Sequence, residues 1–145
     1  MTENSEEVLD SPTGWVADHI RRYVETDGRD GHMYQEWPTL LLSTRGRKSG
    51  KLRRTALIYG RDGDRYLLAA SNGGSDSHPA WYLNLVADPE VTVQVLADVF
   101  PARARTVTGA ERSSLWRIMA SVFPLYDTYQ GKAEREIPLV ILERR

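Results

Sequence analysis

Apolar residues recur at helical spacing in two stretches of the chain, and each stretch predicts an amphipathic helix. In the stretch from 15 to 25 these residues are Val16, Ile20, Tyr23 and Val24. In the later stretch they are Leu115, Ile118, Met119 and Val122. A shorter helix is predicted in PAWYLNLVAD from Pro79, because proline lacks the N–H that the first helical position leaves unpaired. We expect the first helix to pack on the body of the protein.

Short runs rich in β-branched and aliphatic residues predict strands between these helices. The runs are TLLLST from Thr39, TALIYG from Thr55, RYLLAAS from Arg65 and VTVQVLA from Val91. Asp62-Gly63 supplies the positive φ of a tight hairpin between the second and third runs. Ala102 and Ala104 alternate with arginines in a fifth strand, and IPLVILE near the end predicts a sixth. Residues 26 to 38 predict a connection.

Short strands joined by hairpins, with a few helices between them, predict an α+β fold whose sheet curls into a barrel. A sandwich is the alternative. The chain has 145 residues, enough for one compact domain with one core. We expect that domain over residues 13–145, after a flexible acidic tail over residues 1–12.

Charge and cysteine content narrow the class of protein. The net charge is -1 and there is no cysteine, which excludes disulfides and thiolate metal sites and favours a cytoplasmic protein. No segment approaches the roughly 20 apolar residues that span a bilayer, and the start of the chain is unlike a signal peptide. We also expect no metal, because His19, His32 and His78 have no second ligand at metal-binding spacing.

The segment from Arg45 to Arg54 carries six cationic residues in ten and joins two predicted strands. Its glycines let backbone N–H groups converge, Ser49 adds a hydroxyl donor, and the arginines add forked donors. The segment therefore predicts an anion-binding loop. A hairpin tip that is basic only for solubility is the alternative.

Nucleic-acid binding through this loop is a weaker interpretation. The rest of the chain is not basic, and no array of aromatic residues stands beside the loop to stack on bases. Gly46 and Gly50 are also too close together for the phosphate-binding loop of nucleotide hydrolases. We therefore expect no nucleic-acid partner.

A second candidate loop, residues 71–79, leaves a strand and enters the predicted short helix. Gly73-Gly74 would let a ligand approach the backbone, and helix N-termini attract anions. Alternatively, the glycines only turn the chain, and Ser77 or His78 caps the helix. Asn84 is polar within an apolar helix, so it is either exposed or uses its amide to hold a ligand or a loop.

Four segments in combination resemble one known family. They are TRGRKSGKLR from Thr44, SNGG from Ser71, WYLNL from Trp81 and FPLYDTYQ from Phe123. Their order and spacing over residues 39–143 resemble the deazaflavin-dependent nitroreductase family of actinobacterial oxidoreductases. The resemblance implies a split β-barrel related to FMN-binding flavoproteins. It also implies hydride transfer from reduced coenzyme F420 to a quinone, a nitroaromatic compound or another electron-poor acceptor.

The resemblance also assigns a coenzyme site. F420 carries a phosphodiester and an oligoglutamate tail, and the family's phosphate-contacting positions correspond to Arg47, Lys48, Ser49 and Arg53. Positions that line the coenzyme pocket correspond to Ser71, Gly73, Gly74, Trp81 and Asn84. The edge of the deazaflavin ring is expected along Thr55, Ala56 and Leu57. Two positions depart from the family: Asn72, which we also expect to bind the coenzyme, stands where many relatives have lysine, and Ala56 stands where proline is common.

Tyr126 and Tyr129 correspond to aromatic positions that close over the acceptor, and they are the candidates for catalytic contact. Phe123 replaces a tyrosine there, and Ile58 stands near another such position. Core packing at helical spacing is the alternative for these aromatic residues. Because of these departures, the identity of the acceptor does not transfer from the family.

Other interpretations stay open at this point. An enzyme of the same fold could use FMN, and a noncatalytic protein could bind or carry F420 without turnover. Monomer and homodimer are both open, and the amphipathic first helix leaves open a peripheral contact with the inner face of the membrane.

Overall fold

The computed structural model describes residues 6–12 and 14–145. Within them, nine strands form one sheet in the order β1-β4-β3-β7-β8-β9-β6-β5, with β2 paired to β3. The strands are Val8–Asp10 (β1), Met33–Tyr34 (β2), Trp37–Arg45 (β3), Leu52–Ile58 (β4), Gly60–Asp62 (β5), Arg65–Ala69 (β6), Glu90–Val95 (β7), Asp98–Val107 (β8) and Leu139–Arg144 (β9). The helices are Gly14–Glu25 (α1), Ala80–Ala87 (α2), Gly109–Val122 (α3) and Leu125–Lys132 (α4), with a 3₁₀ turn at Asn72–Gly74.

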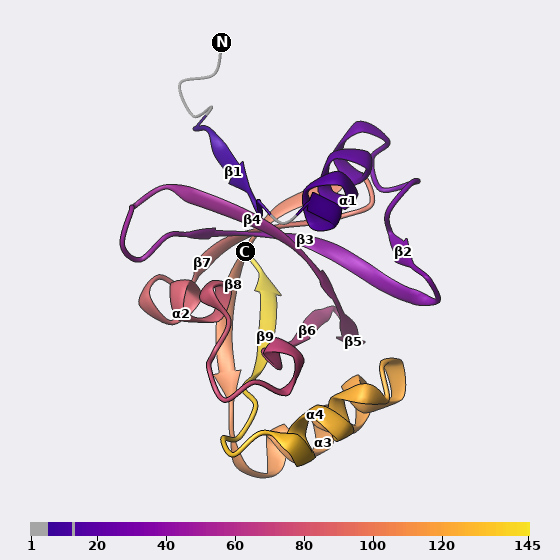
Figure 1. The fold of residues 1–145 in the computed structure, drawn as a ribbon, viewed down its shortest axis with the longest axis vertical. Helices are drawn as coiled ribbons and strands as arrows, with labels where there is room; N and C mark the ends of the chain where they lie inside the picture. The colour runs from indigo at the N-terminus through magenta and orange to yellow at the C-terminus, as the bar shows by residue number, and fades with distance from the viewer. Residues whose placement is uncertain (1–5, 13) are drawn as a thin grey trace.

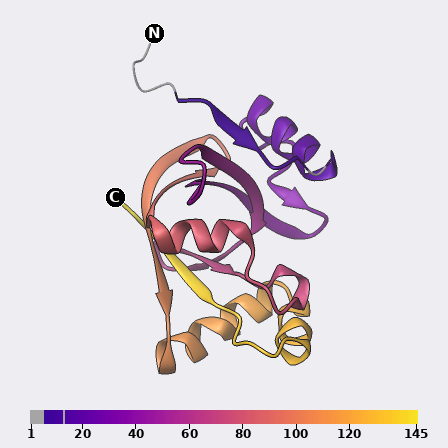
Figure 2. The same cartoon turned by 60° about the vertical axis from the view of Figure 1, so that its left-hand side comes forward.

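The sheet curls because β4 and β5, which lie near its two ends, are almost one strand. Only Tyr59 separates them in the chain, so the covalent backbone joins the two sides of the sheet. Apart from the parallel β1–β4 pair, neighbouring strands are antiparallel. The turned view shows the strands curving around an interior, with α1 outside them (Figure 2). This is the α+β split-barrel fold predicted from the sequence, and the sandwich alternative is wrong.

Alternating residues of the strands face two different cores. In the interior of the barrel, Leu40, Leu42 and Val140 belong to one buried cluster. Their neighbours Leu139 and Ile141 face the opposite side and pack with residues of α3 and α4. A third, smaller cluster is formed by Ile20, Tyr23 and Leu41, and it attaches α1 to β3. Figure 1 accordingly shows α1 and the α3–α4 pair at opposite ends of the molecule.

Most of the predicted elements are confirmed. The predicted first helix is α1, and its buried residues pack on the body as expected. The Asp62-Gly63 turn joins β5 to β6, and Gly63 has the expected positive φ of 62°. No helix in the described part of the chain is both long enough and apolar enough to cross a membrane.

Three short elements were not predicted. The expectation of a flexible tail over residues 1–12 is wrong for Val8–Asp10, which pair with Leu52–Arg54 of β4; residues 1–5 lie outside the described residues. β2 falls in the segment expected to be only a connection, and α4 follows α3 as a separate helix. β1 and β2 have three and two residues, too few for any periodicity to show.

Candidate active site

The basic loop is the hairpin between β3 and β4. The N–H of Gly46 donates to the carbonyl oxygen of Lys51, and the N–H of Gly50 donates to that of Gly46, each over 2.8 Å. Gly50 has a φ of +71°, which a residue with a Cβ adopts only at a cost. These contacts close the loop, while Arg47, Lys48 and Ser49 at its tip are exposed.

Asn84 of α2 holds this loop from behind. Its Nδ2 donates to Thr44 Oγ1 over 3.1 Å, and its Oδ1 accepts from the N–H of Arg47 over 3.1 Å. Asn84 is buried, so the contact with Arg47 ties the loop to the helix in a partly water-excluded place. Of the two roles expected for Asn84, the structure supports the one in which the amide holds a loop.

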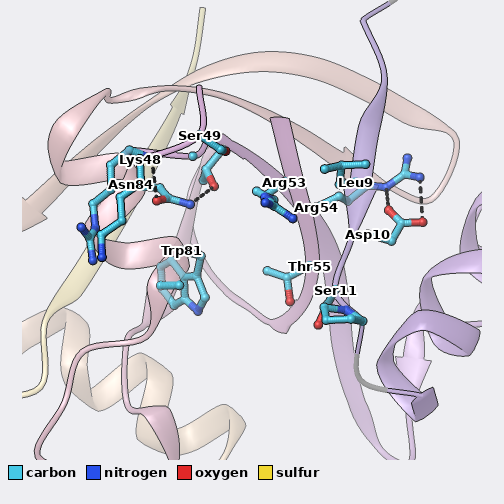
Figure 3. A pocket seen from close by; sticks show the side chains of 15 residues that line it. Leu9, Asp10, Ser11, Lys48, Ser49, Arg53, Arg54, Thr55, Trp81 and Asn84 are labelled. Atoms are coloured by element: carbon cyan, nitrogen blue, oxygen red, sulfur yellow. Dashed lines mark hydrogen bonds and ion pairs between the residues drawn. The ribbon is translucent and has the colours of Figure 1, made fainter. Parts of the chain in front are cut away.

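A cavity of about 500 Å³ opens beside the loop. Figure 3 shows the side chains of Trp81 and Asn84 on one side of it, Leu9 and Asp10 on the other, and Arg53 between them. Seven of the residues expected to bind the coenzyme line it: Arg47, Lys48, Ser49, Arg53, Thr55, Trp81 and Asn84. We call it the cationic cavity.

The cations of this cavity differ in how they are paired. Arg54 forms an ion pair with Asp10, over 2.6 Å from Nε to Oδ1. Arg47, Lys48 and Arg53 form no ion pair with any carboxylate of residues 6–12 or 14–145. These three side chains are therefore available to an anionic ligand.

A second cavity, of about 260 Å³, is lined mainly by aromatic and apolar side chains. Five more of the expected coenzyme residues line it, namely Ala56, Leu57, Ser71, Asn72 and Gly73, together with the expected acceptor residues Tyr126 and Tyr129. The family departures Ile58 and Phe123 also line it. We call it the aromatic cavity.

Tyr126, one of the two tyrosines expected to contact the acceptor, is buried in the wall of the aromatic cavity, with 5% of its surface exposed. Burial raises the pKa of Tyr126 well above its usual value, and the nearby Tyr129 raises it further. The phenol is therefore neutral at physiological pH and keeps its proton for hydrogen bonding. The ring also packs against Phe123 at 4.9 Å between centroids, so Tyr126 combines core packing with a place in the cavity wall.

The SNGG turn and α4 are in close contact. A Cβ added to Gly74 would lie 3.2 Å from both the Cα and the carbonyl oxygen of Tyr129. Gly74 itself lines neither cavity among the described residues. The structure thus gives Gly74 a role in packing against Tyr129, and the coenzyme contact expected for Gly74 stays a prediction.

Arg135, which the sequence did not single out, fixes the segment that follows this turn. Its guanidinium donates to the carbonyl oxygens of Ser71 (3.0 Å), Ser75 (3.0 Å) and Ser77 (3.2 Å). Its Nη1 lies 3.1 Å from Nδ1 of His78. Burial lowers the pKa of His78, and the charge of Arg135 lowers it further, which favours the neutral imidazole that can accept this hydrogen bond.

Both cavities border β4. Thr55 lines the cationic cavity and the next residue, Ala56, lines the aromatic cavity. A ligand with an anionic tail and a flat ring system could therefore lie along β4 with each part in a matching environment. Contacts of individual residues with such a ligand stay a prediction.

Sequence reasoning missed one wall of each cavity. Residues 9–12 line the cationic cavity, and Trp15, His19, Tyr34 and Thr39 line the aromatic one. Trp15 and Tyr34 stack with centroids 5.8 Å apart, and His19 Nε2 lies 3.3 Å from Thr39 Oγ1. The aromatic residues in residues 15–37 were the one signal that could have indicated this wall.

Comparison with known proteins agrees with this geometry. Residues 15–144 match the family model described as F420H(2)-dependent quinone reductase. The chain is 40% identical over 131 residues to an F420H(2)-dependent quinone reductase of Mycobacterium tuberculosis strain H37Rv, covering 88% of each chain. It is similar to a solved F420-H2 dependent reductase, with 40% identity, a TM-score of 0.69 and coverage of 73% of this chain and 94% of that one. Another solved structure, described as a domain-swapped dimer, has 39% identity, a TM-score of 0.71 and coverage of 92% of this chain and 100% of that one.

Proposed function

The chain belongs to the F420H(2)-dependent quinone reductase family, and on this basis we propose that it reduces a quinone with F420H2 bound along β4. The observation that supports this assignment most directly is that a cationic and an aromatic cavity both border β4, the first at Thr55 and the second at Ala56. Nitroaromatic and other electron-poor compounds are further candidate acceptors. We propose that residues 13–145 act as a single coenzyme-binding domain.

The cationic cavity fits the anionic part of F420. Arg47, Lys48 and Arg53 carry the positive charge, and Ser49 adds a hydroxyl at the tip of the loop. Guanidinium groups bind phosphate and carboxylate oxygens through paired hydrogen bonds. We propose that these four residues hold the phosphodiester and the tail, and that Trp81 forms a wall of the same site.

The remaining coenzyme residues suit the ring. Ala56 and Leu57 offer an apolar strand edge, and Ser71, Asn72 and Gly73 lie in the opposing turn. When bound, the deazaflavin supplies the hydride. The protein orients the two reactants and excludes water between them.

The aromatic cavity suits a planar acceptor. Reduction of a quinone to a hydroquinone adds one hydride and one proton. Negative charge develops on a carbonyl oxygen of the quinone as the hydride arrives. A neutral phenol can donate a hydrogen bond to that oxygen. We propose this role for Tyr126, with Tyr129 in contact with the acceptor and solvent as the final source of the proton.

Replacing Tyr126 by phenylalanine is expected to lower kcat for quinone reduction about a hundredfold, the lower end of the range for loss of one positioned hydrogen-bond donor. The affinity for F420 should stay unchanged, because the tail-binding residues lie in the other cavity. The control is Tyr82→Phe, which also removes one hydroxyl; that group lies 3.0 Å from Thr106 Oγ1 and lines neither cavity. Equal kcat values for Y126F and the unaltered protein would remove Tyr126 from the mechanism.

The activity itself is tested by mixing the purified protein with F420H2 and menadione under anaerobic conditions. We expect protein-dependent appearance of oxidised F420, followed by its absorbance. A parallel titration with FMN should show weaker binding than with F420. Binding of F420 without oxidation of F420H2 by several quinones and nitroaromatic compounds would instead identify a noncatalytic carrier, and preferential binding of FMN would identify the flavin enzyme.

We also propose an oligomeric state and a location for the protein. A homodimer is favoured over a monomer because one similar structure is described as a domain-swapped dimer. The buried side chains of α1 pack against β3, which supports action without the membrane contact that the sequence left open. A cytoplasmic location is proposed from the absence of cysteine.

A further inference from the structure

The segment Glu6–Pro12, which we call the N-terminal strap, lies along the cationic cavity. Its β1 pairs with the first three residues of β4, and the N–H of Ser11 donates to the carbonyl oxygen of Arg54 over 2.9 Å. Residues 9–12 line the cavity, and Figure 3 shows Leu9 and Asp10 on the side opposite Trp81. The strap precedes the region matched by the family model, which begins at residue 15.

The strap places carboxylates on two cations of the basic segment. Asp10 accepts hydrogen bonds from Arg54 through both carboxylate oxygens, from Nε at 2.6 Å and from Nη2 at 3.2 Å. Glu6 accepts a hydrogen bond from Nη1 of Arg45. The basic segment thus has two sets of cations: those available at the loop, and Arg45 and Arg54, which the chain's own carboxylates hold.

The strap is attached weakly. Three strand-paired residue pairs, one further backbone hydrogen bond from Ser11 and the ion pairs of Glu6 and Asp10 join it to the sheet. The side chains of Asp10 and Arg54 are 32% and 23% exposed, and ion pairs that water reaches contribute little to stability. Segments held by few contacts open at low free-energy cost. A competing carboxylate can therefore replace the strap without disturbing the barrel.

We propose that Arg54 and Arg45 form a second subsite for the oligoglutamate tail, and that Asp10 and Glu6 occupy it until carboxylates of the tail replace them. The exchange is of like for like, since each guanidinium keeps a carboxylate partner. A coenzyme without glutamates has no tail carboxylate that could replace Asp10 or Glu6, so the strap stays in place. This inference rests on the proposed binding of F420.

The first test compares F420 with a long oligoglutamate tail and the same deazaflavin phosphodiester without glutamates, each titrated at low salt. Asp10→Asn should raise the affinity for the long-tailed form about three- to tenfold, because it removes a competing charge a few ångströms from the tail. The affinity for the form without glutamates should not change. In Asp10→Asn combined with Arg54→Gln, the gain should disappear, because the cation that receives the tail is gone.

Asp98→Asn is the matched control. It makes the same change in charge and also removes one exposed ion pair, with Arg144 of β9, outside both cavities. It should alter neither affinity. An equal gain with both coenzyme forms in Asp10→Asn, or no gain with either, would overturn the proposal.

Hydrogen exchange of the strap gives a readout that is independent of turnover. In the unaltered protein, the amides of residues 8–11 should exchange faster when the long-tailed coenzyme is bound and at an unchanged rate with the form without glutamates. Slower or unchanged exchange with the long-tailed form would show that the strap stays in place, and would overturn the proposal. Failure of both coenzyme forms to bind the unaltered protein would instead contradict the proposed function.

Discussion

F420 is expected to bind about 10- to 100-fold more weakly when Lys48 and Arg53 are both replaced by alanine. Hydrogen bonds to charged groups contribute about 1.5–3 kcal/mol each, and we take less than the sum of two because both side chains are exposed to solvent. The folded state should be unaffected, since neither side chain forms an ion pair within the described residues. A fluorescence titration of the coenzyme measures the change.

The control for this variant is Arg103→Ala combined with Arg117→Ala. It removes the same charge from exposed positions that line neither cavity. If the effect is local, only the loop variant loses affinity, and its binding becomes less sensitive to salt because fewer cations meet the tail. Equal losses in the two variants would mean that overall charge, and not the loop, attracts the coenzyme.

Gly74→Ala is expected to destabilise the protein by about 2–4 kcal/mol and to weaken binding of the quinone. Gly74 has a φ of +84°, where a side chain costs of the order of 1 kcal/mol. The new Cβ would also lie 3.2 Å from two backbone atoms of Tyr129, and relief of such overpacking costs roughly 1–3 kcal/mol more. Thermal or denaturant unfolding gives the loss of stability.

Gly73→Ala separates the two causes. Gly73 also has a positive φ, of 65°, but a Cβ there would meet no atom within 4 Å. Its cost should therefore be the backbone cost alone, about 1 kcal/mol. Because α4 must move away from Gly74→Ala, that variant should also raise KM for the quinone. Gly73 lines the aromatic cavity itself, so Gly73→Ala serves as the control for stability alone. Equal losses of stability would show that the approach of Tyr129 to the turn carries no energetic weight.

The parts of the fold and site that could be predicted are those that depend on residues adjacent in the sequence. The Asp62-Gly63 turn depends on the conformational preference of two neighbours, and the basic loop is one uninterrupted run of charge. Asn84 was recognised as anomalous because a polar side chain stands out in an apolar helix. Its partners could not be predicted, because Thr44 and Arg47 are 40 and 37 positions away.

The parts that could not be predicted depend on distant pairings of short or ordinary segments. The strap contains three paired residues, and its attachment depends on Arg54, which is 44 positions from Asp10. Arg135 is one arginine among many in the sequence, and only the folded chain brings its guanidinium to the carbonyl oxygens of residues 70–77. Physical proximity, and not residue type, gives these residues their roles.

The placement of the two cavities on different supporting elements has a consequence for how the protein can change over evolutionary time. The coenzyme tail would meet the β3–β4 hairpin and α2, whereas the acceptor would meet α1 and α4. Substitutions on those two helices can therefore alter which acceptor is reduced while leaving the residues that hold the coenzyme tail unchanged. Such a layout favours diversification of acceptors among proteins that all draw on one cellular pool of F420H2.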